Sequence, residues 1–268
     1  MRAFHVLEIG ASHILVGKPC QDYAASIETE NYAIAVVADG HGSDCYFRSD
    51  RGSRLAVATA LQMLQEFLSQ TDNMRTLPKN DWQHQLAASI ISRWGEAIEK
   101  DKSNEEFTEA ELSLLKEPQM QRVSEGKWQF VYGTTLIAIV RTEKVFFGMH
   151  IGDGKCVCFD SKGKPSQPIP WDDDCFQNRT TSLCDGDALT RFRFVYQTKK
   201  LPVEMFIASD GVDDTYATDE RLYTFYDALR KTFRSNPETA VKDLQEFLPQ
   251  MSAKGSKDDI SIAGIIIM

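Results

Sequence analysis

The sequence contains no apolar run near the roughly 20 residues that a membrane-spanning helix needs. Its first residues, MRAFHVLEIGASH, lack the basic stretch and the long apolar stretch of a secretory signal. Dense runs of lysine or arginine are also missing, and the net charge is −9, whereas a nucleic-acid-binding protein usually presents a basic face. We therefore expect a soluble, cytoplasmic protein whose partners include neither a membrane nor a nucleic acid.

Cysteine is scarce, with six residues scattered through a chain of 268. Cys156 and Cys158 form a C-x-C pair that would point to one face of a strand. A zinc site there would need two further ligands, for which Cys175 and Cys184 are the candidates. We favour buried, reduced thiols, because nothing in the sequence brings these four residues together and disulfides are rare inside cells.

Internal repeats and flexible linkers are also missing, so one domain over residues 1–268 is the simplest interpretation. Apolar runs predict strands in AFHVLEIG, YAIAVVA, WQFVYGTTLIAIV, KVFFGMHIGD, KCVCF, RFRFVYQ, VEMFIAS and ISIAGIIIM. Lys162-Gly163 predicts a hairpin turn. Residues 165–190 are polar and rich in proline and aspartate, so they predict a long irregular loop, which is usually functional or mobile.

Helical spacing of apolar residues predicts helices over 50–69, after Asn80, and within 219–252. Asn80 or Asp81 is the candidate N-cap of the second helix, and residues 103–117 predict a shorter acidic helix or a loop. Helix pairs thus alternate with groups of strands, unlike the strict alternation of a parallel α/β sheet. We predict an α+β fold, a four-layer α-β-β-α sandwich of two mainly antiparallel sheets flanked by helix pairs.

Four apolar runs end or begin on an aspartate. Three of them run into Asp-Gly, at Asp39, Asp153 and Asp210, and Asp258 stands just before the last run. Carboxylates gathered at strand tips form an anionic pocket that is too repulsive to persist without cations. Ligands that are all oxygen favour hard ions such as Mg²⁺ or Mn²⁺. Each Asp-Gly pair alone is also a common hairpin turn, but the four together favour a metal site.

The string Asp39-Gly40-His41 is the most informative of these. Asp39 can bridge two ions with its two carboxylate oxygens, and the backbone of Gly40 can approach an ion closely. His41 stands beside that charge, where an imidazole can deliver a proton to a leaving oxygen. Further carboxylates, expected behind the ligands or in solvent, are those of Asp213, Asp214 and Asp259. The histidines expected to be structural or exposed are His5, His13, His84 and His150, of which His150 is also a candidate for a place behind the ligands.

At these motifs the chain resembles the protein phosphatase 2C family, the metal-dependent serine/threonine phosphatases, bacterial type. The matching strings are GKPCQD, VVADGHG, YGTTLIAIV, HIGDGK, ASDGVDD and DDISI, in the family's order along nearly the whole chain. The resemblance implies a β-sandwich flanked by helix pairs. It also implies hydrolysis of phosphoserine and phosphothreonine in proteins with two Mg²⁺ or Mn²⁺ ions.

The resemblance also implies roles for single residues. Asp39 would bridge both ions, Gly40 would offer its carbonyl to one of them, and Asp210 and Asp258 would bind the same ion. Asp153, shared with Asp210, would help to hold a third, weaker ion.

Around these ligands, His41 would be the general acid. Asp22 would lie behind the ligands, as we also expect for Asp214. Residues 165–190 would form a flap near the substrate.

The chain departs from the family where many members place an arginine, shortly before the motif that holds Asp22, to bind the substrate phosphate. The matching stretch here reads VGKPCQD, so Lys18 is the expected phosphate-binding residue, with Arg48 and Arg51 as alternatives. Gln21 stands where some members have a glutamate that contacts an ion through water, and glutamine keeps an oxygen acceptor.

These residues predict that the substrate is a phosphoprotein of a serine/threonine kinase pathway. A water activated between two divalent cations would attack its phosphate group. The alternative is a catalytically weak or inactive phosphoprotein-binding module on the same fold, because the usual arginine is missing. A two-metal nuclease is a third alternative, which the acidic net charge disfavours.

Overall fold

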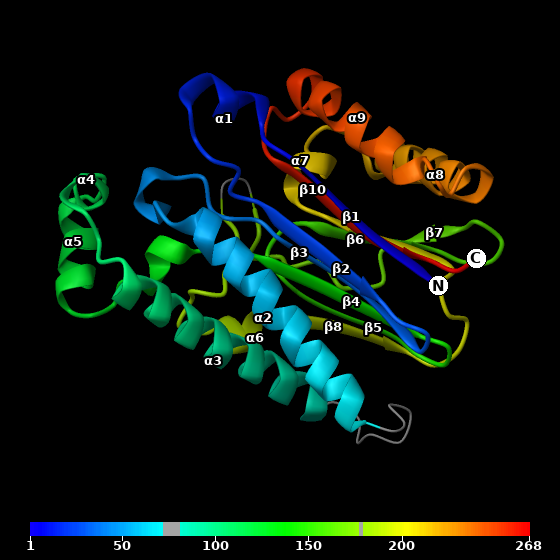
Figure 1. Ribbon diagram of the computed structural model, residues 1–268, viewed down its shortest axis with the longest axis horizontal. Coiled ribbons are helices and arrows are strands. Elements are labelled where there is room, and N and C mark those ends of the chain that lie inside the picture. Colours follow the sequence, from blue (N-terminus) through cyan, green and yellow to red (C-terminus); the bar gives the residue numbers. More distant parts are fainter. Residues whose placement is uncertain (72–80, 177–178) are drawn as a thin grey trace.

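Two five-stranded sheets lie face to face in the computed structural model, which describes residues 1–71, 81–176 and 179–268 (Figure 1). The first sheet has the order β1 (Arg2–Glu8), β10 (Ile260–Ile266), β9 (Glu204–Ala208), β6 (Lys155–Phe159) and β7 (Pro165–Ser166). The second has the order β2 (Tyr23–Glu28), β3 (Tyr32–Ala38), β4 (Leu136–Thr142), β5 (Phe146–Ile151) and β8 (Arg193–Gln197). Neighbouring strands are antiparallel throughout both sheets.

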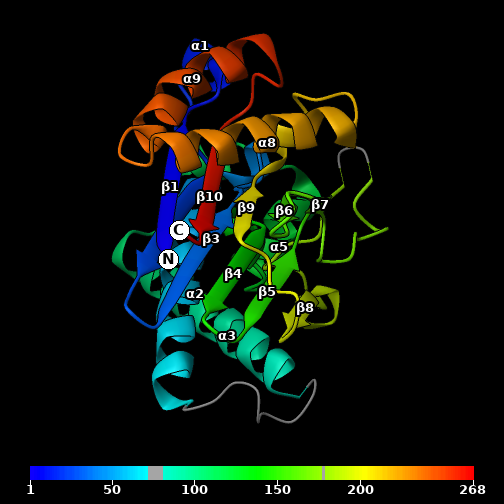
Figure 2. The same ribbon diagram turned by 90° about the vertical axis from the view of Figure 1, so that its right-hand side faces the viewer.

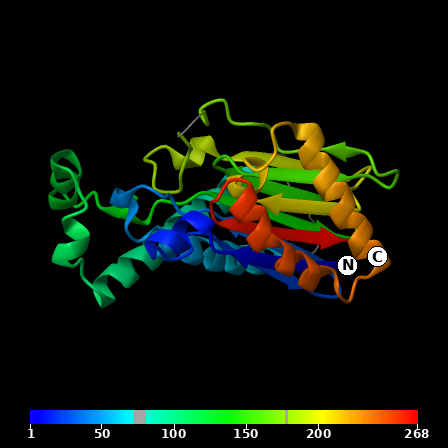
Figure 3. The same ribbon diagram turned by 90° about the horizontal axis from the view of Figure 1, so that it is seen from above.

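Helices cover the outer face of each sheet. The helices α2 (Ser49–Gln70) and α3 (Asp81–Asn104) pack on the second sheet, and α8 (Asp219–Ser235) and α9 (Ala240–Lys254) pack on the first (Figures 2 and 3). Each helix buries one apolar stripe and leaves its other side in solvent. The predicted α+β sandwich with four layers is therefore confirmed. Within the described ranges, no helix has both the length and the apolar character to span a bilayer.

The space between the sheets is filled by small and branched apolar side chains, among which Cys156 and Cys158 are buried. Their sulfur atoms lie 3.8 Å apart, and all six cysteines are free. Cys175 and Cys184 contact threonine and serine hydroxyls in another part of the chain. The described residues thus do not assemble the four cysteines into the zinc site that was the alternative.

Some local structure differs from the prediction. The segment Gln129–Tyr132, predicted as strand, is a 3₁₀ helix (η3): Gly133 donates its N–H to Phe130 O at 2.8 Å within the turn, and Arg48, at the start of α2, donates its N–H to Val131 O at 3.0 Å. Residues 103–117 hold the end of α3 and the helix α4 (Glu109–Leu112), with α5 (Glu117–Ser124) beginning at their end. Asn80, a candidate N-cap, lies outside the described residues, and α3 begins at Asp81.

A short helix, α1 (Ala11–Val16), was not expected at all. It lies between the glycines Gly10 and Gly17, and Gly17 ends it with a left-handed φ of 70°. Three further short helices follow strands: η1 (Asp44–Tyr46) lies between β3 and α2, α6 (Ala188–Arg191) between β7 and β8, and α7 (Asp210–Asp213) between β9 and α8. The hairpin predicted at Lys162-Gly163 joins β6 to β7, and Gly163 has the positive φ of 78° that such a turn uses.

The topology brings the predicted aspartates to one end of the sandwich. Strands β3 and β5 both pair antiparallel with β4, so they run in the same direction and their last residues reach the same edge. In the other sheet, β9 ends where its antiparallel neighbour β10 begins. Figure 1 shows α1 and α7 at this end of the sandwich and both chain termini at the other.

Candidate active site

A cavity of about 650 Å³ opens at the end of the sandwich where these strands meet. Its wall contains every residue predicted to bind metal, namely Asp39, Gly40, Asp153, Asp210 and Asp258, together with His41 and Asp214. Asp39 and Asp153 come from the second sheet, and Asp210 and Asp258 come from the first. Residues more than 200 positions apart therefore meet in one anionic site.

The glycines of the three Asp-Gly pairs explain how the strand tips approach so closely. A Cβ on Gly40 would lie 2.6 Å from two backbone oxygens, one on Gly154 would lie 2.3 Å from Ala208 O, and one on Gly211 would lie 2.0 Å from Asp259 O. None of the three has a positive φ, so these pairs are not the hairpin turns that Asp-Gly often forms. Each glycine instead lets the backbone of another segment pack against the aspartate before it.

Gly211→Ala should therefore destabilise the protein and weaken metal binding. The added Cβ would displace the backbone that carries Asp258, and overpacking of this kind typically costs about 1–3 kcal/mol of the free energy of unfolding. Urea unfolding and calorimetric titration with Mn²⁺ would measure the two effects. Gly95→Ala is the matched control, because a Cβ on Gly95 meets no atom within 4 Å. Unchanged stability and Mn²⁺ affinity in Gly211→Ala would show that the close contact is not required.

Burial and mutual repulsion raise the pKa of several carboxyls in the cavity. The pKa of Asp39 is raised well above its ordinary value, first by burial and then by the charges of Asp22 and Asp210. Burial, followed by the charge of Asp153, raises the pKa of Asp210 to about 7. Removal from water and like charge both disfavour the ionised form. These carboxyls therefore need cations to be fully ionised near neutral pH.

Without divalent ions, the protein should lose stability as the pH rises from about 4 to about 7. The pKa of Asp210 is about 7 in the folded protein, against an ordinary value of 3.8. Between these values the unfolded chain has released a proton that the folded protein still holds, so rising pH favours unfolding. Urea midpoints at pH 5, 6 and 7.5 would measure this slope. Saturating Mn²⁺ or Asp210→Asn should flatten it, and a metal-free protein that gains stability over this range would contradict the argument.

The donor set fits hard divalent cations. Every predicted ligand is a carboxylate or carbonyl oxygen, the type that Mg²⁺ and Mn²⁺ prefer. Gln21 adds an observation of its own: its Nε2 donates to His41 O at 3.0 Å and to Ser49 Oγ at 2.5 Å, which leaves Oε1 buried without a partner in the cavity wall. A buried acceptor without a donor costs free energy, and a water bound to an ion would satisfy it.

His41 is held beside this cluster by its backbone and its ring. Its N–H donates to Gly133 O at 3.1 Å, and its ring packs edge-on against Tyr46 with 4.8 Å between centroids. A Cβ on Gly133 would lie 2.6 Å from Cδ2 of the imidazole, so only glycine leaves room for this ring. Burial lowers the pKa of His41 to about 4, which favours the neutral imidazole near neutral pH.

Asp22 and Asp214 occupy different places. Asp22 is buried behind the cavity wall, where Oδ2 accepts a hydrogen bond from Ser261 Oγ at 2.7 Å, and burial raises its pKa. Asp214 instead lines the cavity directly, and burial followed by the charge of Asp258 raises its pKa. His150, the other candidate for a place behind the ligands, is buried in β5 and does not line the cavity.

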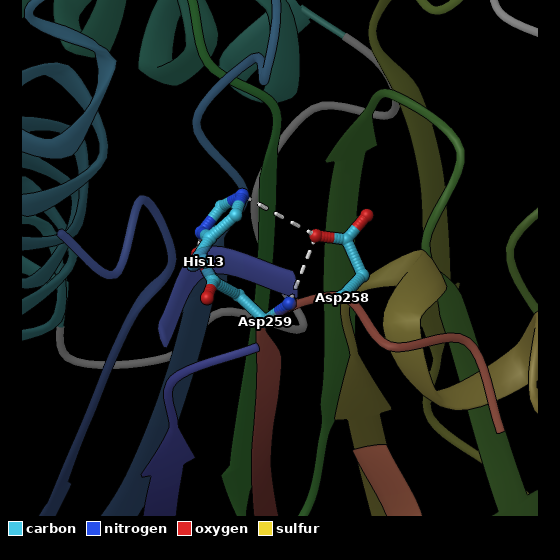
Figure 4. A group of neighbouring side chains, drawn as sticks. All are labelled: His13, Asp258 and Asp259. Carbon is cyan, nitrogen blue, oxygen red and sulfur yellow. Dashed lines mark hydrogen bonds and ion pairs between the residues drawn. The ribbon is translucent and has the colours of Figure 1, made fainter. Parts of the chain in front are cut away.

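His13, expected to be structural or exposed, lies in the cavity wall. Figure 4 shows it beside Asp258 and Asp259: its Nδ1 lies 3.0 Å from Asp259 Oδ2, and its Nε2 lies 4.0 Å from Asp258 Oδ1. The Asp259 carboxylate also accepts the N–H groups of Gly10 and Gln21, both at 2.6 Å. Asp259 therefore fastens the connection between β1 and β2 to the start of β10. The bracketing glycines of α1 were the signal that could have located His13.

The cations proposed for phosphate binding point elsewhere. Lys18 does not line the cavity, and its Nζ donates to Gly42 O at 3.1 Å and to Asp44 at 3.2 Å. Arg48 is buried and makes two hydrogen bonds to Glu111, at 2.7 and 3.2 Å. Arg51 is bonded to Asp101 and Glu105 on α3 and the segment after it. The phosphate-binding role of Lys18 stays a prediction.

The irregular stretch 165–190 supplies part of the cavity wall, with Arg179, Thr180, Ser182, Cys184 and Asp185. Its role as a flap near the substrate stays a prediction. Sequence reasoning missed Arg179, although it is the only lysine or arginine between residues 165 and 190. A single cation in a segment predicted to face a phosphate group was the available signal.

Comparison with known proteins gives the same picture. The family model for protein phosphatase 2C matches residues 9–249, whereas no curated protein sequence matches the chain. Among solved structures, a bacterial serine phosphatase aligns over 100% of this chain and 98% of its own, with a TM-score of 0.62 and 15% identity.

Two other solved structures share the fold. The catalytic domain of the serine/threonine phosphatase PstP, in complex with two manganese ions, aligns over 100% of this chain and 98% of its own, at a TM-score of 0.55 and 16% identity. PppA, a regulatory component of the type VI secretion system in Pseudomonas aeruginosa, aligns over 100% and 97% of the two chains, at a TM-score of 0.59 and 17% identity. Because the family model covers most of the sequence, the chain belongs to the protein phosphatase 2C family of serine/threonine phosphatases.

Proposed function

We propose that this protein hydrolyses phosphoserine and phosphothreonine in proteins with the help of two divalent cations, Mn²⁺ or Mg²⁺. The observation that carries the proposal is the convergence of Asp39, Asp210 and Asp258, from both sheets, on one cavity that also holds His41. The two manganese ions in the PstP catalytic domain support the same cofactor here. The raised pKa values of the buried carboxyls support the same proposal, because they mark a place where crowded acidic groups lack a counter-charge that cations would supply.

In this proposal, Asp39 would be shared between the two ions, with the Gly40 carbonyl on one of them and Asp210 and Asp258 on the same ion. Asp153 and Asp210 would hold a third, weaker ion. When bound, such ions supply an activated water and neutralise charge on the phosphoryl oxygens. Gln21 would orient water through its free Oε1.

The remaining residues position groups and move a proton. His41 would protonate the departing serine or threonine oxygen, which needs the imidazolium form. Burial opposes that form by lowering the pKa of His41 to about 4, whereas the negative charge of a bound phosphate would favour it. Asp22, bonded to Ser261, would keep the strand ends behind Asp39 in register. Asp214 would stand at the cavity wall beside Asp258.

A hydrolysis assay with p-nitrophenyl phosphate and a phosphoserine peptide, with and without Mn²⁺, tests the proposal. We expect both substrates to be hydrolysed with Mn²⁺ and neither with a chelator. Binding of the phosphopeptide without hydrolysis would favour the inactive binding module. Cleavage of a phosphodiester in DNA or RNA, but not of these monoesters, would favour the nuclease.

The substrate would be a phosphoprotein of a serine/threonine kinase pathway, and we infer a place in signal transduction in the cytoplasm. The six free cysteines support a reducing compartment. We also infer that the whole chain works as one domain, because β1 and β10, from its two ends, are paired over their full length.

A further inference from the structure

The cavity has very little positive charge with which to receive a phosphate group. Seven aspartates line it, and Arg179 is the only lysine or arginine among its lining residues in the described part of the chain. Two divalent ions would neutralise four of these charges, and a phosphate dianion would then add two more negative charges. An additional cation at the phosphate is therefore electrostatically favoured.

Arg179 is anchored at the cavity by its neighbours. It exchanges both backbone hydrogen bonds with Phe176, each at 3.1 Å. The next residue, Thr180, lies close to Asp153, where its hydroxyl counteracts the rise that burial causes in the pKa of that carboxyl. The backbone of Arg179 is thus fixed from both sides, close to a predicted ligand of the cations.

The guanidinium of Arg179, in contrast, is not bonded to any residue that the structure describes. Its side chain is exposed and has no hydrogen-bond or ion-pair partner among residues 1–71, 81–176 and 179–268. Arg193, at the start of β8 just after residues 165–190, donates to Pro170 O and Gly152 O. Lys18, Arg48 and Arg51 are committed to carboxylates outside the cavity. Arg179 is therefore the cation with both the position and the free donors.

We propose that Arg179 binds the phosphate group of the substrate, a role that rests on the proposed phosphatase activity. Its planar guanidinium presents paired N–H donors that match two phosphate oxygens. A bound phosphate keeps these oxygens in both the ground state and the transition state, so the contact should act mainly on KM. Inorganic phosphate, the product, should bind through the same contact.

Arg179→Ala should raise KM for a phosphoserine peptide and for p-nitrophenyl phosphate by about 10-fold, with kcat little changed. The inhibition constant of inorganic phosphate should rise by the same factor. In Arg179→Lys, both constants should lie between those of the wild type and those of Arg179→Ala, because lysine keeps the positive charge but lacks the paired N–H donors of a guanidinium. Arg191→Ala, an arginine near the same segment that is bonded to Asp174 and Asp187, should leave both constants unchanged.

Two results would overturn the proposal: unchanged KM and phosphate inhibition in Arg179→Ala, or equal shifts in Arg179→Ala and Arg191→Ala. A rise of KM in Lys18→Ala but not in Arg179→Ala would return the role to Lys18. If the wild-type protein hydrolyses neither substrate with Mn²⁺, the proposed function itself fails. Calorimetric titration of the Mn²⁺-loaded protein with inorganic phosphate then tests whether Arg179 binds phosphate. Weaker binding in Arg179→Ala supports this role, and equal binding refutes it.

Discussion

Asp39→Asn is expected to abolish hydrolysis of a phosphoserine peptide and of p-nitrophenyl phosphate alike. Replacing a residue that only hydrogen-bonds to a metal ligand typically lowers activity or metal affinity by about 10–100-fold. The loss of a direct ligand should be at least as large. Asp210→Asn should behave in the same way, because both changes remove cations that every substrate needs.

The stability of these variants separates a lost ligand from a damaged fold. Burial and the charges of Asp22 and Asp210 raise the pKa of Asp39 well above its ordinary value, so a neutral amide relieves repulsion in the metal-free protein. Asp39→Asn without metal should therefore be at least as stable as the wild type at pH 7.5, and it should gain much less stability from Mn²⁺. The control is Glu99→Gln, which neutralises an exposed carboxylate of α3 and should change neither property. Strong Mn²⁺ stabilisation retained in Asp39→Asn would mean that Asp39 is not a ligand.

The sequence was sufficient to predict the layers and the cluster of aspartates. Apolar periodicity distinguished the strands from the long helices, because side chains recur every second residue in one and every third or fourth in the other. The aspartates were found because each stands at the tip of an apolar run. Once two of the strands are known to share an antiparallel neighbour, their tips must reach the same edge of the sheet.

What sequence patterns missed depends on contacts between distant segments. Nothing in the apolar pattern marks Gln129–Tyr132 as leaving the strand conformation; one of its carbonyls, that of Val131, instead accepts the N–H of Arg48 at the distant start of α2. The six residues of α1 are too few for a visible helical period, so the two glycines that bracket it were the only local signal for the position of His13. The orientation of Lys18 was equally hidden, since Asp44 competes with the cavity for its ammonium group.

His41→Ala is expected to slow hydrolysis of a phosphoserine peptide by about 10²–10⁴-fold, the usual contribution of a general acid. Hydrolysis of p-nitrophenyl phosphate should fall much less, because p-nitrophenolate is a good leaving group that needs little protonation. The ratio of the two losses is the measurement that matters. His5→Ala, an exposed histidine on β1, is the control for removal of an imidazole elsewhere.

Burial of His41 adds a pH dependence to the general-acid prediction. With its pKa lowered to about 4, His41 of the free enzyme carries a proton in only a small fraction of molecules near neutral pH. If His41 is the general acid, we expect kcat for the phosphopeptide to fall as pH rises, whereas kcat for p-nitrophenyl phosphate should stay nearly constant. Gly133→Ala keeps the imidazole but puts a Cβ 2.6 Å from its Cδ2, so it should produce a milder version of the same leaving-group dependence. Equal losses on both substrates in His41→Ala, with unchanged Mn²⁺ affinity, would assign His41 a supporting role and make another group the proton donor.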